Sequence, residues 1–360
     1  MTFKSLLLGS AAALATVSGA RAADAVVYEP EPVEYVKVCD AYGAGFFYIP
    51  GTETCLSING YVYFQVGGTS DRDGGLAITD TPGYHGFGYG GYNVATRGRL
   101  NIDARSDTEW GTLRSFVRLE GTWGTNADGN VALNQAYLEL GGLRMGYTES
   151  AWVESMNAGV AVLGSHSDSG LYFANQLRHQ VNYTFSANGF AATLSLEHDE
   201  GPAATDWVPD VVGVLSYNAG WGGAWAKVAY DNDDLILPGR QGGWSAQLGM
   251  QVNIPNMNGS SLRLLGFYAD TPNAYAVGSE WSVLASYNHV FTDTFSASVG
   301  FQYFNDTNYA LAGSPDAWAA ELSTVWTPVQ NFEVRTESVY TKADGLSGSL
   351  SSFVRFTRYF

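Results

Sequence analysis

The chain alternates apolar and polar residues along much of its length. From Leu56 to Val66 every second residue is apolar or glycine, and Ser, Asn, Tyr and Gln stand between them. The same alternation returns at 95–106, 112–123 and 295–302. A period of two places successive side chains on opposite faces of a β-strand. We count about sixteen such segments of about ten residues each, so the pattern predicts an all-β protein.

The connections between these segments alternate in length. Short ones such as 187–189 and 327–331 hold Gly, Asn or Pro, whereas 67–94, 149–176 and 231–241 are long and either polar or rich in glycine. Turn residues at such short spacing are typical of β-hairpins. The order therefore predicts antiparallel hairpins that are joined alternately by turns and by loops.

The positions of the aromatic residues distinguish two architectures. A soluble sandwich hides its apolar face in a core, whereas a membrane barrel turns that face toward lipid. Trp281, Phe291, Trp318 and Trp326 stand near the ends of apolar faces, with small or aliphatic residues such as Val299 between them. Aromatic girdles at both membrane interfaces have this arrangement. The sequence predicts a transmembrane antiparallel β-barrel of 16 strands.

Such a barrel has to close, because an unpaired strand edge in hydrocarbon costs several kcal/mol for each backbone group. The last strand must therefore pair with the first. The chain's end alternates from Ser352 through Val354 and Phe356 to a terminal Phe360, which resembles the assembly signal of bacterial outer-membrane barrels. Arg358 interrupts this alternation, and its long stem can carry the charge to the interface.

Charge is scarce and mainly negative. Charged residues make up 15% of the chain, against about 25% in a typical soluble domain. The formal net charge is −17, so the chain has no basic footprint for nucleic acid, and we expect no such partner.

The N-terminus has the features of a secretory signal: Lys4, an uncharged apolar run, and the Ala20-Arg21-Ala22 cleavage motif. We expect residues 1–22 to be removed, which leaves 16 basic and 35 acidic residues and a net charge of −19. The expected organisation is a signal peptide (1–22), a periplasmic segment with a disulfide loop (23–54) and a β-barrel (55–360).

Cys39 and Cys55 are the two cysteines, and both follow the signal. In an oxidising compartment they predict a disulfide, which stabilises by roughly 3 kcal/mol through the loop it closes. A metal site would need histidines nearby, and none lies between Asp24 and Tyr84. The five histidines are scattered without zinc spacing, so we expect no metal and no cofactor.

The stretch Val38–Leu56, with the sequence VCDAYGAGFFYIPGTETCL, closely resembles the N-terminal signature of alphaproteobacterial porins of the rhizobial type. Residues 135–142 are similar to the general-porin strand that precedes the third loop. The resemblance implies a homotrimer of sixteen-stranded barrels in the outer membrane, in contact with lipid and lipopolysaccharide. It also implies passive passage of small hydrophilic solutes and ions, with a third loop that folds inward to narrow the pore.

In a channel, fixed charges at a constriction set which ions pass. Arginines recur on the polar faces of the predicted strands, and alternate residues of a strand share a face. We predict that they form a basic wall of the pore; the candidates are Arg97, Arg99, Arg105, Arg114, Arg118, Arg144 and Arg178. The plainer alternative is that some of them pair with Asp103 and Glu120.

Opposite charge is expected from the third loop, 149–176, which holds Glu149, Glu154 and Asp168 and no Lys or Arg. We hypothesise that Glu154 and Asp168 face the basic wall at the constriction. The alternative is an exposed acidic loop. The negative net charge suggests weak cation selectivity, which the basic wall opposes.

Two other functions are weighed against a general diffusion pore. Tyr61 and Tyr63 lie on a polar face, where aromatic rings could form the stacking track of a sugar-specific channel. An outer-membrane barrel enzyme has only His289, with serines nearby, in its favour and no nucleophile-base spacing. We predict a general pore without enzymatic activity.

Apolar faces differ between the two ends of the barrel sequence. Aromatics are rare on the first five strands and frequent in 281–326. Interfacial aromatics suit contact with lipid headgroups, and small residues suit close approach of protein walls. We therefore predict that Leu100, Ile102, Val117 and Leu119 face a neighbouring copy.

Overall fold

The computed structural model describes residues 37–70, 92–124, 127–153, 164–168, 171, 173–198, 207–232, 242–257, 259–307 and 314–360. The chain divides into two units, Met1–Lys37 and Val38–Phe360, and the second holds every strand. The expected signal peptide, 1–22, lies outside the described residues. No helix in the described ranges is long and apolar enough to cross a membrane.

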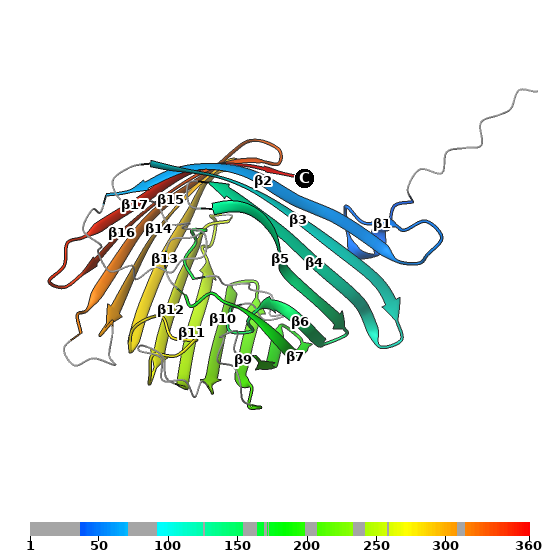
Figure 1. Cartoon of the computed structure of the whole chain (residues 1–360), viewed down its shortest axis with the longest axis horizontal. Coiled ribbons are helices and arrows are strands. Elements are labelled where there is room, and N and C mark those ends of the chain that lie inside the picture. Colours follow the sequence, from blue (N-terminus) through cyan, green and yellow to red (C-terminus); the bar gives the residue numbers. More distant parts are fainter. Residues whose placement is uncertain are drawn as a thin grey trace, which may run out of the picture. The chain divides into compact units, whose positions relative to one another are not determined.

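The second unit consists of strands and one short 3₁₀ helix (Figure 1). These elements are η1 (Asp40–Tyr42), β1 (Phe47–Tyr48), β2 (Cys55–Thr69), β3 (Tyr92–Thr108), β4 (Gly111–Gly124), β5 (Ala127–Leu140), β6 (Leu143–Glu149), β7 (Leu177–Ala187), β8 (Phe190–Glu197), β9 (Asp210–Ala219), β10 (Gly222–Asp231), β11 (Gly243–Asn253), β12 (Ser261–Ala269), β13 (Trp281–Thr292), β14 (Phe295–Asn305), β15 (Ala317–Val329), β16 (Phe332–Ala343) and β17 (Ser349–Tyr359).

Each strand from β2 to β17 pairs antiparallel with the next, and β17 pairs with β2, from Ser351↔Thr69 to Tyr359↔Tyr61. The terminal Phe360 continues this seam, because its N–H and C=O pair with the backbone of Gly60 at 3.1 and 3.0 Å. The prediction of a closed, antiparallel, 16-stranded barrel is confirmed. The small strand β1 pairs with the start of β2, beyond the end of β17, and covers that edge.

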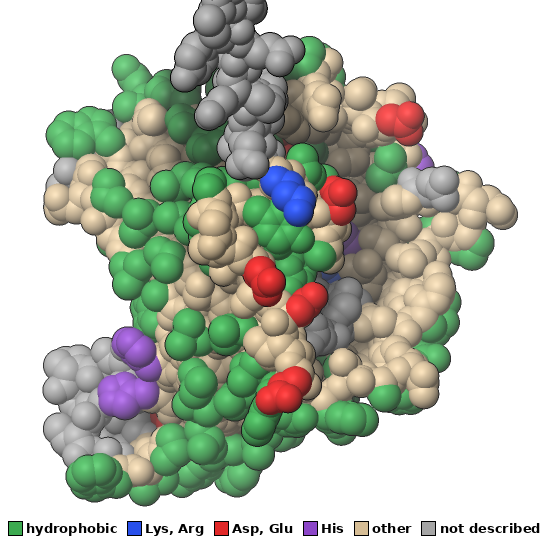
Figure 2. Space-filling view, turned by 90° about the vertical axis from the view of Figure 1, so that its right-hand side faces the viewer, with side chains coloured by type: hydrophobic (Ala, Val, Ile, Leu, Met, Phe, Trp, Pro, Cys, Tyr) green, Lys and Arg blue, Asp and Glu red, His purple; other side chains and the backbone are tan. Residues whose placement is uncertain are grey.

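The alternation of the sequence separates an outer from an inner face. On β2, Ile58, Val62 and Phe64 are about half exposed, whereas Tyr63 and Gln65 on the other face are buried. Figure 2 shows hydrophobic side chains over much of the face it presents and only a few charged ones. The apolar face is therefore the outer one, as a barrel in lipid requires.

Turn residues end the hairpins where the sequence predicts. Asn188 and Gly189 connect β7 to β8, and both have positive φ, at 51° and 84°. This is the geometry of a two-residue turn that matches the strand twist. Asn331, with φ of 62°, is the second residue of the turn between β15 and β16.

The predicted disulfide between Cys39 and Cys55 is confirmed, with Cα atoms 5.9 Å apart. It fixes the segment before β2 as a small lobe in which Phe46 is buried against the cystine. The Tyr42 hydroxyl donates to Asp107 Oδ1 at 2.7 Å, so the lobe is also tied to the end of β3.

Candidate functional site

The inner face of β3, β4 and β6 carries most of the predicted basic wall. Arg97, Arg99, Arg105, Arg114, Arg118 and Arg144 alternate there with outward-facing residues of the same strands. The registers of β3 with β4 and of β5 with β6 place them on neighbouring rungs of one sheet. The structure thus brings six of the seven predicted arginines together on one side of the lumen.

Glu120 of β4 lies between two of these arginines. Arg97 Nη1 is 3.0 Å from Glu120 Oε1, and Arg99 Nη2 is 2.5 Å from Oε2. One carboxylate therefore serves two guanidinium groups, and the excess charge at this point of the wall is positive.

Two further carboxylates bridge the arginines nearer the β3–β4 turn. Asp103 Oδ2 is 2.7 Å from Arg105 Nη2 and 2.8 Å from Arg114 Nη2. Glu139 contacts Arg114 Nη1 at 3.1 Å and Arg144 Nε at 2.7 Å. The alternative in which wall arginines pair with Asp103 and Glu120 is thus present in the structure. The wall is a ladder of shared ion pairs.

Two of the seven candidate arginines, Arg105 and Arg178, contact groups outside the ladder. The Arg105 guanidinium also lies 5.0 Å from the ring centre of Phe46, so it borders the disulfide lobe. Arg178 of β7 is buried away from the ladder, 3.8 Å from Asp210 and 5.5 Å from the ring centre of Tyr275. Burial and the neighbouring acids raise the pKa of Tyr275 well above its usual value. Arg178 therefore belongs to a separate buried cluster.

Two arginines of the inner wall are missing from the prediction. Arg355 of β17 lies 4.6 Å from the ring centre of Tyr63, and Arg97 lies 5.3 Å from the same ring. Arg335 of β16 pairs with Glu333 and Glu337. The alternation of the last strands contains these positions, but only the closure of β17 on β2 places Arg355 beside Arg97.

The third loop connects β6 to β7, and its first residues are held inside the barrel. The Ala151 N–H donates to Glu197 Oε1 of β8 at 2.9 Å. Lys227 Nζ of β10 donates to the carbonyl oxygens of Trp152 at 2.6 Å and Val153 at 3.2 Å. Inward-facing side chains of two strands thus fix the start of the loop.

Residues 164–168 of the same loop lie against other strands. Arg263 Nη1 of β12 donates to the carbonyl oxygens of Gly164 at 2.9 Å and Ser165 at 2.5 Å. The ring nitrogens of His166 lie 2.7 Å from Ser286 Oγ and 2.8 Å from Ser261 Oγ. These bonds attach the loop to β12 and β13.

Burial and the charge of Arg263 lower the pKa of His166 to about 3. The imidazole is therefore neutral at any physiological pH. A neutral ring has one donor and one acceptor nitrogen, which suits two serine hydroxyls. His166 thus acts as a fixed anchor of the loop and carries no charge into the lumen.

Asp168 ends the described run of the loop. Its N–H donates to Glu337 Oε1 of β16 at 2.6 Å, and its carboxylate forms an ion pair with Arg355 of β17. Burial opposes ionisation of this carboxyl, but Arg355 and then Arg335 outweigh it and hold the pKa of Asp168 below its usual value. Asp168 thus pairs with an arginine outside the predicted set.

The other two acidic candidates, Glu149 and Glu154, differ in what the structure describes of them. Glu149 is the last residue of β6 rather than part of the loop, and it is half-buried. Glu154 lies outside the described residues. The predicted contact between Glu154 and the basic wall stays a prediction.

The inner face of the other strands carries an apolar cluster among polar side chains such as Lys227 and Arg263. Inward-facing side chains of β9, β10 and β12–β16 form one buried cluster with residues of the third loop and of the β12–β13 connection. Its largest members are Trp152, Leu171, Trp225, Leu265, Phe267, Tyr275, Leu284 and Phe304. The ladder arginines of β3, β4 and β6, and Arg355 of β17, lie outside this cluster.

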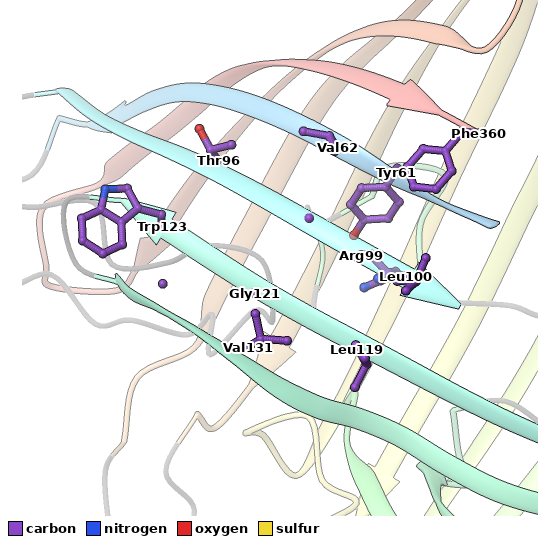
Figure 3. A pocket seen from close by; sticks show the side chains of 12 residues that line it. Tyr61, Val62, Thr96, Arg99, Leu100, Leu119, Gly121, Trp123, Val131 and Phe360 are labelled. Atoms are coloured by element: carbon purple, nitrogen blue, oxygen red, sulfur yellow. The ribbon is translucent and has the colours of Figure 1, made fainter. Parts of the chain in front are cut away.

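The outer face of β2–β5 carries a groove of about 610 Å³ (Figure 3). Gly98 and Gly121 leave it open, because they have no side chain there, and Trp123 and Val131 line one end. Leu100 and Leu119, two of the four predicted subunit contacts, line it as well.

Comparison with known proteins decides the family. A family model described as the porin subfamily matches residues 24–353. Porin Omp2b of Brucella neotomae is 36% identical over 96% of this chain and 94% of its own length. Porin Omp2b of Brucella suis is 36% identical over the full length of both chains. The chain belongs to the porin subfamily. The resemblance seen in its sequence is thereby confirmed.

Solved structures share the porin's fold. The outer membrane channel DcaP of Acinetobacter baumannii has a TM-score of 0.69 at 15% identity and covers 87% of this chain and 99% of its own. An anion-selective porin from Comamonas acidovorans has a TM-score of 0.59 at 15% identity, over 86% and 100%. Family and fold together make this porin a general diffusion channel of the outer membrane, and they indicate a channel rather than an enzyme.

Proposed function

We propose that small hydrophilic solutes and ions cross this porin along the charged side of the lumen, between the arginine ladder and the third loop. The observation that carries this proposal is the contrast between the two sides. Buried Trp, Leu and Phe side chains pack against the loop on one side, and arginines with shared carboxylates line the other. Arginine stays charged at every relevant pH, so the ladder keeps this passage hydrated.

The constriction in this proposal has the ladder as one wall and the third loop as the other. Asp168 brings negative charge to Arg355, beside Arg97 and Tyr63. Glu154 remains the second candidate for the acidic side. Fixed charges on facing walls set ion passage through such a site.

A sugar-specific channel has less support. Tyr63 is only 3% exposed, and the guanidinium groups of Arg97 and Arg355 lie over its ring. Arg99 lies over the ring of Tyr61 at 4.8 Å. Sugar stacking needs a free ring face, and here cations occupy those faces.

The position of His289 does not support an enzymatic function. His289 alternates with Phe291 on the outer face of β13, and their ring centres are 4.3 Å apart. The Tyr287 hydroxyl lies 2.8 Å from His289 Nδ1. A histidine among outward aromatics is poorly placed to activate a nucleophile for a polar substrate.

We propose weak cation selectivity. Pairing of the ladder arginines with Glu120, Asp103 and Glu139 reduces their preference for anions. The excess of 35 acidic over 18 basic residues then favours cations over the whole chain. Salt screens exposed charges beyond about 8–10 Å, so this preference should shrink at high ionic strength.

We also propose a homotrimer, with lipid and lipopolysaccharide around its outer face. Leu100, Ile102, Val117 and Leu119 face outward on β3 and β4, and two of them line the groove of Figure 3. Glycines in this groove allow a second protein wall to approach closely. Removal of residues 1–22 on export, which leaves 23–54 on the periplasmic side, belongs to the same proposal.

Single-channel recording in planar bilayers, repeated with sugars of increasing size, tests the general pore. We expect an open current that each small sugar lowers in proportion to its concentration, up to a size limit. Saturable block by one oligosaccharide would instead favour the sugar-specific channel. A purified barrel that conducts no ions would contradict both functions.

A further inference from the structure

Arg118 differs from the other five arginines of the ladder. Each of those five has a carboxylate oxygen within 3.1 Å: Arg97, Arg99, Arg105, Arg114 and Arg144. Among the described residues Arg118 has no such contact. Its Nε donates to Asn101 Oδ1 at 2.9 Å, and its two Nη groups have no acceptor there.

The neighbours of Arg118 are amides held in a chain. Asn101 stands opposite Arg118 in the register of β3 with β4 and donates through Nδ2 to Asn59 Oδ1 at 2.9 Å. Asn59 in turn donates to Ser57 Oγ at 3.3 Å. These bonds orient the oxygen of Asn101 toward Arg118, so the guanidinium is fixed at Nε while its outer edge stays available.

The local charge balance favours an anion at this position. Glu120 is the nearest wall carboxylate of β4 and already contacts both Arg97 and Arg99. Arg118 thus adds a third guanidinium to a region whose carboxylates are Glu120 and, at longer range, Glu149. Figure 3 shows Arg99 beside Tyr61, with the ring covering one side of that guanidinium.

We propose that Arg118 is a docking site for carboxylate-bearing solutes within the pore, with Arg99 and Asn101 at its rim. A guanidinium presents two parallel N–H donors that match a carboxylate in a bidentate pair. Because Arg118 has no ion pair among the described residues, a solute carboxylate that binds there displaces none. The inference rests on the proposed passage along the charged side.

The test compares tartrate with erythritol, which has the same four-carbon skeleton and no charge, in single-channel recordings. We expect tartrate to block the wild-type potassium chloride current saturably and erythritol to lower it only in proportion to concentration. In Arg118→Gln the half-blocking concentration of tartrate should rise about tenfold. Arg118→Lys should recover only part of this loss, because an ammonium lacks the planar fork.

Arg358→Gln is the matched control, because it removes one positive charge from an exposed position at the end of β17, outside the ladder. We expect its half-blocking concentration to change less than threefold, since the site at Arg118 remains intact. An equal loss in Arg358→Gln and Arg118→Gln would show a diffuse effect of charge and overturn the site. A conducting wild type without saturable tartrate block would also overturn it and leave the diffusion pore standing. A wild type that does not conduct would refute the pore itself.

Discussion

The two sides of the inner wall carry different inward side chains on strands with the same alternating pattern. On β2–β6 and β16–β17 the inward residues include Arg, Asp, Glu and Asn, which form hydrogen-bonded ladders. On β9–β15 they include Trp225, Leu265, Leu284 and Phe304, which pack against the third loop. Apolar groups in a barrel interior need a cover, because water contact costs free energy. The contrast supports the proposal that solutes pass along the charged side, while most contacts of the third loop lie on the packed side.

The first way to break this contrast is to remove the largest loop side chain from the packed side. Trp152 is buried and meets the Tyr275 ring edge-on at 5.8 Å. Trp152→Ala should cost about 3–5 kcal/mol of stability and leave the third loop loosely held. We expect a lower heat-denaturation temperature on detergent gels and noisier channel currents. Trp110→Ala, in the exposed β3–β4 turn, is the control, and equal behaviour of the two variants would contradict the packed side.

The outer surfaces of the two sides also differ. Val117 is outward on β4 and is one of the four predicted subunit contacts, and Val299 is outward on β14 and about half exposed. An arginine on a lipid-facing barrel site costs about 2–4 kcal/mol at mid-membrane. Val117→Arg should dissociate the heat-sensitive oligomer on an unheated gel, whereas Val299→Arg should leave it assembled. An oligomer that resists dissociation equally in both variants would contradict the assignment of this face as the subunit contact.

The disulfide lobe borders the charged side, where the Arg105 guanidinium lies 5.0 Å from the ring centre of Phe46. Cys39→Ser should lower stability by roughly 3 kcal/mol, because the unfolded chain regains the freedom of the closed loop. Heat or urea titration of the folded band on unheated gels measures this change. Wild-type protein treated with a reductant should match the variant. The lobe would be irrelevant to stability if reduction and substitution both left the midpoint unchanged.

The smallest expected effect concerns Asp168, where the loop meets the charged side. Its lowered pKa means that the contact with Arg355 is present above the usual carboxyl value and is lost as pH falls through the lowered one. Current noise should therefore stay constant from pH 7 to about pH 5 and rise below about pH 4. Asp168→Asn should show that noise at pH 7, with a loss of about 1 kcal/mol. Asp344→Asn, on an exposed loop, should not show that noise at pH 7. A wild-type current whose noise does not change with pH would refute the contact.

Much of the fold follows from the sequence, because strand alternation and turn residues are local signals. The outward position of Ile58 and the inward position of Arg97 were both readable from the period of two. Arg355 was not, because its place beside Arg97 depends on the register in which β17 closes on β2. Leu265 was also hidden, since Leu264 beside it is apolar too and faces outward. Alternation cannot identify the inner face where both faces are apolar.

Cysteine accessibility tests the central claim most directly, in a background with serine at positions 39 and 55. Asn59→Cys places a thiol on the charged side, where Asn59 is exposed, and Leu284→Cys places one in the packed side, where Leu284 is fully buried. A small charged methanethiosulfonate reagent should lower the conductance of Asn59→Cys within seconds to minutes and leave Leu284→Cys unchanged. Equal reaction at both positions would contradict a passage confined to the charged side.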